Sequence, residues 1–213
     1  MKIIITGGSG FIGSELVRYF VKKKYNVINI DNLSQGSVNE SLTHIDKKNY
    51  KFFKFSINNK EKVYNLIKKE KPRYVFNLAA ESHVDNSITN PIKTYQTNVI
   101  GTLNLVNSSN QLLKKNILDR KKFKFIHIST DEVYGSIKFN EKKLFDENSN
   151  YSPSSPYSAS KASSDFILQS WFKTYEFPCI ITHCVNNFGP WQFPEKLIPV
   201  VIDKCINQKR IPI

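Results

Sequence analysis

The chain has 213 residues, of which 40% are hydrophobic and 23% are charged, and its formal net charge is +13. This composition predicts a globular protein that buries one sizeable core. No apolar run approaches the roughly 20 residues of a membrane-spanning helix, and a predicted strand follows Met1 at once, leaving no room for a signal peptide. We therefore expect a cytoplasmic protein without membrane association.

Short runs rich in β-branched residues alternate with helical patterns along the chain. Strands are predicted at residues 2–6, 26–31, 50–55, 74–79, 123–128 and 179–185, and helices at 11–24, 60–69, about 91–115, 156–175 and 195–207. The helix at 156 has Ser155 as its N-cap and Pro156 at its first position. Because uniformly apolar strands alternate with helices, the sequence predicts an α/β fold with a doubly wound parallel sheet.

The composition argues against a nucleic-acid partner and against a metal site. The basic residues come as short runs scattered along the chain, such as 22–24, 68–69 and 120–122, without a stripe interleaved with aromatic residues. This favours a solvated basic surface that modestly attracts anionic ligands. Three cysteines, Cys179, Cys184 and Cys205, lack metal-ligand or CxxC spacing, so we expect reduced thiols.

A glycine-rich turn lies between the first predicted strand and the first predicted helix. In TGGSGFIG, residues 6–13, the glycines Gly7, Gly10 and Gly13 allow the backbone to approach a pyrophosphate at the helix N-terminus. Asp31 ends the second strand, where a carboxylate accepts from an adenosine ribose hydroxyl and repels a 2′-phosphate. This order predicts an NAD-binding Rossmann fold, selective for NAD over NADP. Glycines that serve tight packing alone are the alternative.

Tyr157 and Lys161 stand four residues apart on a predicted helix, so their side chains share one face. An ammonium about 4 Å from a phenol, at an effective dielectric constant of about 20, favours the phenolate by a few kcal/mol, on the order of 3 pKa units. Tyr157 is therefore predicted to act as a base near neutral pH. The YxxxK pattern alone is common on helix surfaces, and it gains weight here from the glycine-rich turn and from a strand leading into Ser129 and Thr130.

Thr130, Asp131 and Glu132 are three proton-handling residues in a row, in the stretch ISTDEVYG that follows an apolar strand. Strand ends are where open α/β sheets place their chemistry. Taken alone, the stretch is also compatible with a solvated acidic loop. The glycine-rich turn and the Tyr–Lys pair favour a catalytic interpretation.

With these motifs in register, the chain resembles the extended short-chain dehydrogenases, and among them the nucleotide-sugar 4,6-dehydratases that act on dTDP-glucose or UDP-glucose. The matching segments are TGGSGFIG from Thr6, LAAESHVDNSI from Leu78, ISTDEVYG from Ile128, SPSSPYSASKASSD from Ser152 and NNFGPWQFPEKLIP from Asn186. In sister epimerases the two positions after the catalytic hydroxyl are typically not acidic. Asp131 and Glu132 therefore indicate dehydration, with an epimerase or reductase as the weaker alternative.

The resemblance implies a mechanism. Tyr157 takes the proton of the sugar C4 hydroxyl while the C4 hydride passes to NAD, with Thr130 bonded to that oxygen and Lys161 to the nicotinamide ribose. Glu132 then removes the C5 proton, Asp131 protonates the departing C6 hydroxyl, and the hydride returns to C6. One carboxyl group must be an acid and the other a base, so their pKa values must differ.

The resemblance also implies two sets of binding residues. NAD contacts are expected from Gly7, Gly10, Phe11, Ile12, Gly13, Asp31, Asn32, Ser56, Ile57, Leu78, Ala79, Ala80, Tyr157 and Lys161. Substrate contacts are expected from Ser82, His83, Thr130, Asn187, Glu195, Lys196 and Leu197. A core histidine is an equal alternative for His83, and an ordinary helix start is the alternative for 195–197. Family members usually have Asp before Ile where this chain has Ser56, so a weaker hold on adenine is expected.

Domain organisation and assembly follow from the resemblance as well. Residues 1–185 are expected to form the NAD-binding Rossmann domain and 186–213 to begin a substrate-binding part, which continues in family members for well over a hundred residues. We therefore expect a truncated chain, either active or a remnant that only binds NAD or a partner. Helices starting near Pro91 and Tyr157 form the family's dimer interface, so a homodimer is expected. The choice between dTDP and UDP stays open, because the base-binding residues lie mostly after Ile213.

Overall fold

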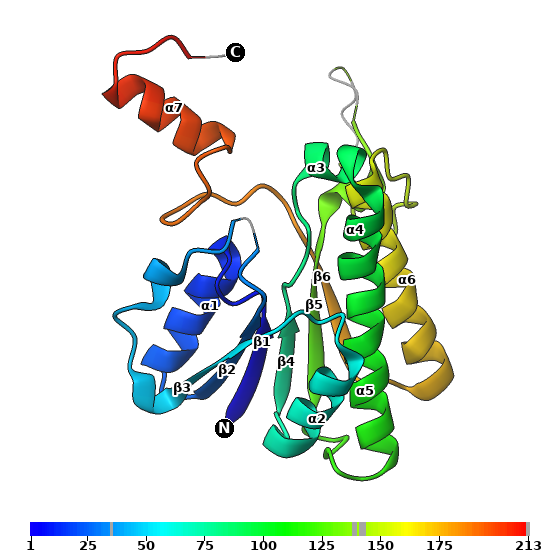
Figure 1. The fold of residues 1–213 in the computed structure, drawn as a ribbon. Coiled ribbons are helices and arrows are strands. Elements are labelled where there is room, and N and C mark those ends of the chain that lie inside the picture. The colour runs from blue at the N-terminus through cyan, green and yellow to red at the C-terminus, as the bar shows by residue number, and fades with distance from the viewer. Residues whose placement is uncertain (35, 138–139, 141–143, 212–213) are drawn as a thin grey trace.

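Six parallel strands form one sheet in the computed structural model, which describes residues 1–34, 36–137, 140 and 144–211. The strands are β1 (Lys2–Thr6), β2 (Asn26–Asp31), β3 (Tyr50–Lys54), β4 (Tyr74–Asn77), β5 (Lys124–Thr130) and β6 (Cys179–Cys184). Their order is β3-β2-β1-β4-β5-β6, so the direction of winding reverses between β1 and β4 (Figure 1). The predicted doubly wound parallel sheet is confirmed.

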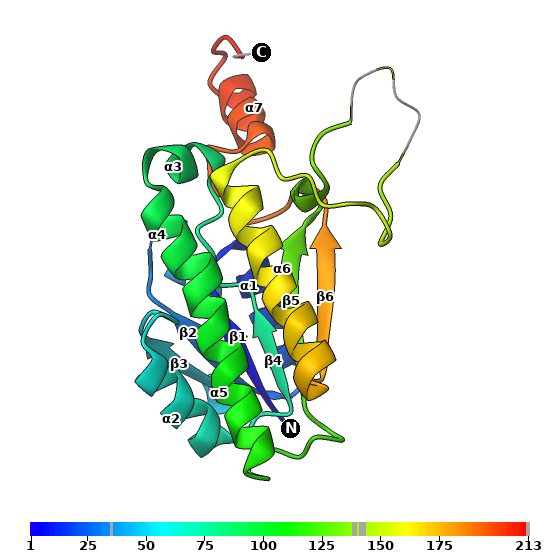
Figure 2. The ribbon, with the colours of Figure 1, turned by 90° about the vertical axis from the view of Figure 1, so that its right-hand side faces the viewer.

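Helices cover both faces of this sheet. On one face α1 (Phe11–Lys22) packs against β1 and β2, while α2 (Lys60–Glu70), α5 (Thr102–Lys114) and α6 (Pro156–Tyr175) lie side by side on the other (Figure 2). The remaining helices are the short α3 (Val84–Thr89) and α4 (Pro91–Tyr95), and α7 (Leu197–Ile206), which lies beyond the carboxyl ends of the strands. Among the described residues, no helix combines the length and the apolar character needed to cross a bilayer.

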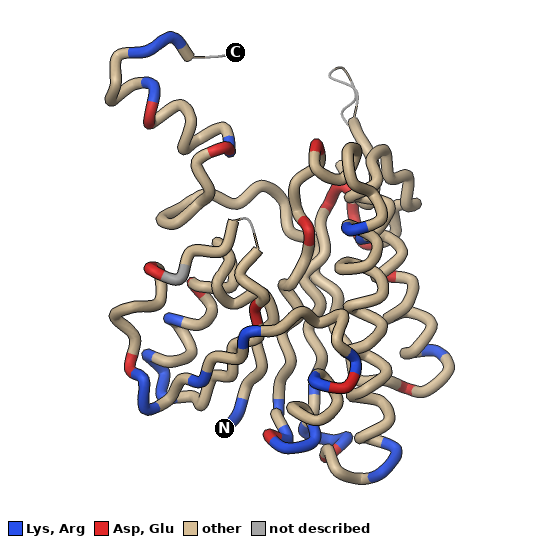
Figure 3. The backbone as a smooth tube through the Cα atoms, viewed as in Figure 1, with Lys and Arg blue, Asp and Glu red and all other residues tan. Residues whose placement is uncertain are grey.

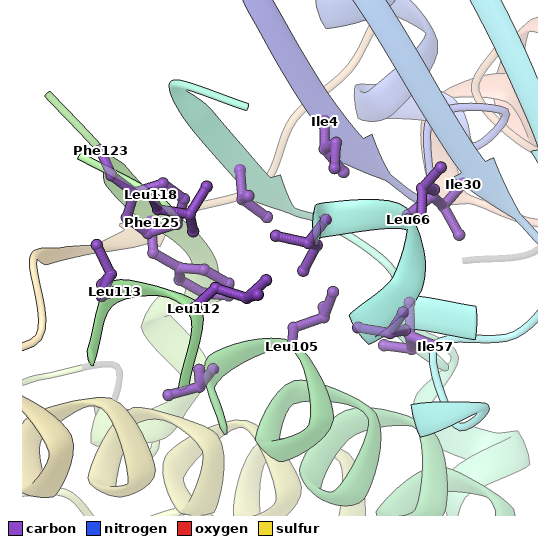
Figure 4. Close-up of a cluster of buried hydrophobic side chains, with 14 of the residues drawn as sticks. Ile4, Ile30, Ile57, Leu66, Leu105, Leu112, Leu113, Leu118, Phe123 and Phe125 are labelled. Carbon is purple, nitrogen blue, oxygen red and sulfur yellow. The ribbon is translucent and has the colours of Figure 1, made fainter. Parts of the chain in front are cut away.

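The core is divided into two layers by the sheet. Side chains alternate along a strand, so Ile4 of β1 faces the layer under α2 and α5, while Ile3 and Ile5 face Val17 and Val21 of α1. Helices cover both faces of the sheet at β1, which is why this strand is apolar at every central position. The larger layer, shown in Figure 4, includes Ile4, Ile30, Ile57, Leu66, Leu105, Leu112, Leu113, Leu118, Phe123 and Phe125.

The basic runs that are scattered in the sequence converge in space. Figure 3 shows Lys and Arg concentrated at the edge where the strands begin, and residues 22–24, 68–69 and 120–122 all end or precede elements there. They belong to several different elements rather than to one helix or strand. The strongest positive charge of the described chain therefore lies away from the carboxyl ends of the strands.

The predicted helix at 91–115 is continuous but not uniformly α-helical. Between α4 and α5 the residues Gln96–Gly101 form a π-helical turn, and α3, which precedes α4, was not predicted. His83 is the N-cap of α3 and accepts from the Asn86 N–H at 3.4 Å. Strand β5 continues two residues past its predicted end, because Ser129 and Thr130 pair with β6.

The start of α6 is fixed by a capping box. The Ser155 hydroxyl accepts from the Ser158 N–H at 3.1 Å, and the Ser158 hydroxyl accepts from the Ser155 N–H at 2.9 Å. These bonds satisfy amide groups that a helix N-terminus leaves unpaired. The predicted N-cap is thereby confirmed, and it sets the position of Tyr157 in the first turn of the helix.

Replacing Ser155 by Ala should lower the free energy of unfolding by about 1 kcal/mol, because the side-chain acceptor of the cap is lost. Asp is an equally good N-cap residue, so Ser155→Asp should retain most of this stability. Urea unfolding of the wild type and both variants measures the difference. Equal losses in the Ala and Asp variants would contradict a stabilising role for the cap.

Candidate active site

A cavity of about 370 Å³ opens at the carboxyl ends of β1, β2, β4, β5 and β6. It lies where the winding of the sheet reverses, which is the place where parallel α/β sheets bind ligands. The predicted site residues that line it are Gly7, Gly10, Phe11, Ile12, Gly13, Asp31, Asn32, Ser56, Ile57, Leu78, Ala79, Ala80, Ser82, His83, Thr130, Asp131, Glu132, Tyr157, Lys161, Asn187, Glu195 and Lys196. Leu197 does not line it, because it starts α7 with 72% of its surface exposed.

The glycine-rich turn joins β1 to α1 with very little space around it. Gly7 has a φ of +70°, and a Cβ there would lie 2.7 Å from the Ala79 nitrogen. A Cβ on Gly13 would collide with the Gly7 carbonyl oxygen, so α1 packs directly on the turn. Helix α1 begins after Gly10 without a side-chain cap. Its first N–H groups, at the positive end of the helix dipole, therefore face the cavity and suit a pyrophosphate.

Asp31 is buried at the end of β2, and most of its carboxylate is bonded to the chain itself. One oxygen accepts from the Ser9 N–H at 2.9 Å, and the other accepts from the Leu33 N–H at 2.8 Å and the Ser37 hydroxyl at 3.0 Å. A carboxylate offers about four acceptor positions, so one remains for a ligand. Ser9 and Ser37 were not predicted as partners of Asp31, although short hydroxyl residues beside a turn carboxylate are a usable signal.

The acidic stretch after β5 is folded back on the end of its own strand. Residues Asp131–Tyr134 form a 3-10 helical turn with Thr130 as its N-cap. The Thr130 hydroxyl accepts from the Glu132 N–H and donates to the Asp131 carboxylate, both at 3.3 Å. Thr130 is buried, whereas Asp131 is partly buried and Glu132 is exposed, and both carboxyl groups line the cavity, so this stretch forms a cavity wall that is open to solvent.

The two carboxyl groups are close enough to influence each other. Loss of water on its protein-facing side raises the pKa of Glu132, the Asp131 charge raises it further, and Lys196 opposes the change. A raised pKa makes a carboxylate a better proton acceptor. The cavity wall therefore carries a carboxyl group of raised pKa next to a second carboxyl group.

Tyr157 and Lys161 lie on the face of α6 that turns toward the sheet. Burial raises the pKa of Tyr157 well above its usual value, and the Glu132 charge adds to the rise, while the Thr130 hydroxyl opposes it. The expectation that Lys161 brings this pKa close to neutral is wrong for this structure. The Lys161 ammonium donates instead to the Ile128 carbonyl at 2.6 Å, and burial of the phenolate is the largest influence on the pKa of Tyr157.

Lys161 is itself buried, and burial lowers its pKa to about 8, with the Asp165 carboxylate opposing the fall. Its nitrogen also lies 3.4 Å from His127 Nε2. A buried ammonium without a carboxylate in direct contact is costly. This position is therefore sensitive to pH in the range just above neutral.

Asn98, in the π-helical turn, connects the two sides of the cavity and was missed from the sequence. Its amide oxygen accepts from the Glu81 N–H at 2.8 Å, and its amide nitrogen donates to the Glu81 carbonyl at 3.0 Å and to the Ser160 hydroxyl at 2.8 Å. The loop after β4, with Ser82 and His83, is thereby held against α6. An asparagine at an inward position of a helical pattern was the available signal.

The outer wall is formed by the segment that follows β6. His83 Nε2 lies 3.1 Å from a Glu195 carboxylate oxygen, with a quarter of the histidine side chain exposed. The alternative of a core histidine is therefore wrong. Asn187 donates to the Val185 carbonyl at 2.8 Å, and the Ser56 hydroxyl accepts from the Asn58 N–H at 3.2 Å.

In the part of the chain that the structure describes, no three His, Cys, Asp or Glu side chains are grouped to hold a metal ion.

Comparisons with known sequences find 4,6-dehydratases. A family model described as GDP-mannose 4,6 dehydratase matches residues 4–213. A dTDP-glucose 4,6-dehydratase of Escherichia coli is 45% identical over 223 residues, covering 100% of this chain and 62% of that protein. The chain therefore spans less than two thirds of the length of this relative.

Solved structures show the same fold. A dTDP-glucose 4,6-dehydratase from Bacillus anthracis in complex with NAD has a TM-score of 0.85 at 40% identity, covering 100% of this chain and 63% of that chain. A UDP-glucose 4-epimerase from Thermotoga maritima has a TM-score of 0.84 at 31% identity, covering 99% of this chain and 64% of that chain. Dehydratase and epimerase chemistry thus occur on closely similar backbones, and the side chains of the cavity must distinguish them.

The lowered pKa of Lys161 predicts a dependence of stability on pH. Between about pH 8 and the value near 10.5 of an exposed lysine, the unfolded chain binds a proton that the folded chain has lost, so stability rises with pH. The free energy of unfolding should increase by about 2 kcal/mol from pH 7.5 to 9.5. Urea unfolding across this range should show the rise in the wild type and not in Lys161→Met. An equal rise in both proteins would contradict the prediction.

Proposed function

Because the chain belongs to the GDP-mannose 4,6 dehydratase family, we propose that it carries the NAD site and the catalytic residues of a nucleotide-sugar 4,6-dehydratase. The observation that carries this proposal is the convergence of a hydroxyl, two carboxyl groups and the Tyr–Lys pair on one cavity beside the glycine-rich turn. The substrate is a nucleotide-activated glucose. The Escherichia coli relative favours dTDP-glucose, and UDP-glucose remains the second candidate.

NAD fits the residues at one end of the cavity. The uncapped N-terminus of α1 faces the pyrophosphate, and the free acceptor position of Asp31 faces the adenosine ribose. Ser56 and Ile57 border the adenine, and the Ser56 hydroxyl offers a weaker bond than a carboxylate. When bound, NAD accepts the C4 hydride and later returns it to C6.

The protein groups move the protons. Tyr157 takes the proton of the C4 hydroxyl, and Thr130 holds that oxygen. Because burial favours the neutral phenol, Tyr157 depends on positive charge nearby, which Lys161 supplies. The ketone formed at C4 acidifies C5, so Glu132 can remove the C5 proton with its raised pKa. The departing C6 oxygen takes its proton from the protonated form of Asp131 and leaves as water, so elimination requires Asp131 as the acid and Glu132 as the carboxylate.

We assign NAD binding and substrate binding to two different parts of the chain. Residues 1–185 form the NAD-binding domain, and residues 186–213 begin the substrate-binding part. The proposal rests on the course of the chain, which leaves the sheet after β6 and brings Asn187, Glu195 and Lys196 to the outer wall of the cavity. These polar side chains suit the phosphates and the sugar. Leu197 lies outside the cavity, so any contact it makes with a nucleotide requires α7 to move.

A homodimer is proposed through the outer face of α4 and α6. These two helices are in contact, and contiguous apolar side chains on a surface mark association sites. The exposed apolar residues are Ile92 and Tyr95 of α4 and Phe166 of α6, together with Ile88 of the preceding α3 and Ile100 of the π-helical turn. Pairing two copies would remove them from water without covering the cavity at the end of the strands.

An epimerase acting on the same substrates is the second candidate. The similarity to the Thermotoga maritima enzyme supports it at the level of the backbone. Epimerisation at C4 does not require an acid and a base beside C5 and C6. The neighbouring carboxyl groups of Asp131 and Glu132 therefore favour dehydration.

Gly13→Ala should weaken NAD binding by about tenfold or more. The added methyl group collides with the Gly7 carbonyl, and overpacking of about 1–3 kcal/mol corresponds to roughly that factor. Calorimetric titration with NAD measures the change, with circular dichroism as a check of folding. Glu15→Ala, on the exposed side of the same helix, is the matched control. Unchanged affinity in a folded Gly13→Ala variant would exclude this turn as the pyrophosphate site.

Glu132→Gln should abolish dehydration and leave C4 oxidation measurable. The assay incubates the purified chain and NAD with dTDP-glucose or UDP-glucose, follows NADH by its absorbance at about 340 nm, and detects the 4-keto-6-deoxy sugar by its absorbance in alkali. Glu61→Gln, an exposed change on α2, is the control. Full turnover by Glu132→Gln would contradict the assigned base. Retained NAD binding without product from either sugar in the wild type would favour a remnant that only binds NAD.

A further inference from the structure

Behind Tyr157 and Lys161, the sheet and α6 enclose a second group of titratable side chains that the proposed mechanism does not use. Asp165, one turn after Lys161 on α6, is 0% exposed, and His127 of β5 is 1% exposed. His183 of β6 and Tyr151 border them. A fully buried carboxylate is rare unless it has a compensating charge.

The contacts of Asp165 differ between its two oxygens. Oδ2 accepts from the Ser129 hydroxyl at 2.8 Å, the Tyr151 hydroxyl at 3.1 Å and His183 Nε2 at 3.2 Å. Oδ1 has no hydrogen-bond partner within the described residues, and the nearest donor atom given for it is His127 Nε2 at 3.5 Å. One oxygen is thus saturated, while the other faces the imidazole that separates it from Lys161.

The tautomer of His127 follows from a chain of hydrogen bonds across the sheet. The Thr6 hydroxyl donates to Asn77 Oδ1 at 2.8 Å, so the Asn77 amide nitrogen points the other way. That nitrogen lies 3.0 Å from the Thr102 hydroxyl and 3.1 Å from His127 Nδ1. Because an amide nitrogen only donates, Nδ1 must accept. The ring proton therefore sits on Nε2, the atom that faces both Lys161 and Asp165.

His127 does not carry the compensating charge itself. Burial lowers the pKa of His127 well below its usual value, and the charge of Lys161 lowers it further. The imidazole is neutral at physiological pH and acts as a polar spacer. Among the residues that the structure describes, Lys161 is the only Lys or Arg that is buried. The buried positive and negative charges thus lie on the same face of α6, four residues apart.

We propose that Asp165 is a positioning residue that keeps Lys161 protonated, with the neutral His127 ring as the spacer between them. The proposal rests on the proposed function only for the use of this charge, which is to favour the phenolate of Tyr157. In the absence of the Asp165 charge, the sheet would enclose an ammonium whose close partners, among the residues that the structure describes, are a carbonyl oxygen and a neutral ring. Such a group loses its proton at lower pH.

Several other groups face this region, and each must be considered in a measurement of pH dependence. They are Tyr157 on α6, Cys184 and His183 on β6, Tyr151 in the loop before α6, and Asp131 and Glu132 after β5. Subtracting the same curve measured without Lys161 removes the groups that do not depend on it.

The test compares two pairs of proteins by urea unfolding from about pH 6 to 9.5. The free energy of unfolding of the wild type minus that of Lys161→Met should begin to rise near pH 8. The difference between Asp165→Asn and the double variant Asp165→Asn/Lys161→Met should begin to rise at least about one pH unit lower. Ser129→Ala removes one hydrogen bond to Asp165 and leaves the Asp165 charge in place. In this variant the rise should therefore begin at the same pH as in the wild type. A rise that begins at the same pH in both pairs overturns the proposal.

The proposal stays testable if Asp165→Asn does not fold. An uncompensated buried ammonium is then the expected cause, and the double variant, which lacks both charges, should recover a cooperative transition. A double variant as unfolded as Asp165→Asn overturns the proposal and assigns Asp165 a purely structural role. Neither experiment uses NAD or a sugar nucleotide. A failed dehydratase assay would therefore leave these results unaffected, and the two proposals can fail separately.

Discussion

All six strands are parallel, and this constraint places every carboxyl end at one edge of the sheet. A parallel sheet needs helices on its faces, so each strand must turn at that edge before its crossover. Thr6, Asp31 and Thr130 each end a strand, and the turns after them meet around one cavity. Residues separated by more than a hundred positions are thereby brought into one site. Many of the basic residues collect at the opposite edge, where the strands begin, whereas Lys161 and Lys196 line the cavity.

Burial and charge compete at the centre of this site. Enclosing Tyr157 and Lys161 between α6 and the sheet holds them in a fixed geometry, but it also disfavours their charged forms. Polar groups lie in layers behind these two side chains, from the Ile128 carbonyl to the Asp165 carboxylate. The protonation of Lys161 thus depends in part on Asp165, whose side chain does not line the cavity.

Sequence patterns predicted what depends on local order. The glycine-rich turn, the Ser155 cap and the apolar strands follow from neighbouring residues, and the structure has them close to the predicted positions. What depends on three-dimensional contact was missed. Asn98, within the π-helical turn, bonds the loop after β4 to α6, a contact that helical spacing cannot reveal. Likewise, the spacing of Tyr157 and Lys161 predicts that they are neighbours but does not include the burial that decides their protonation.

The π-helical turn at Gln96–Gly101 makes this helix intolerant of changes in length. A π-turn contains one residue more than an α-turn. Deleting a residue there would allow an ordinary α-helix, but it would rotate α4 by roughly 100° relative to α5. Asn98 would leave Glu81, and the outer residues of α4 would turn inward. During evolution, substitutions can accumulate on the exposed face of this helix, whereas insertions and deletions within it should be eliminated.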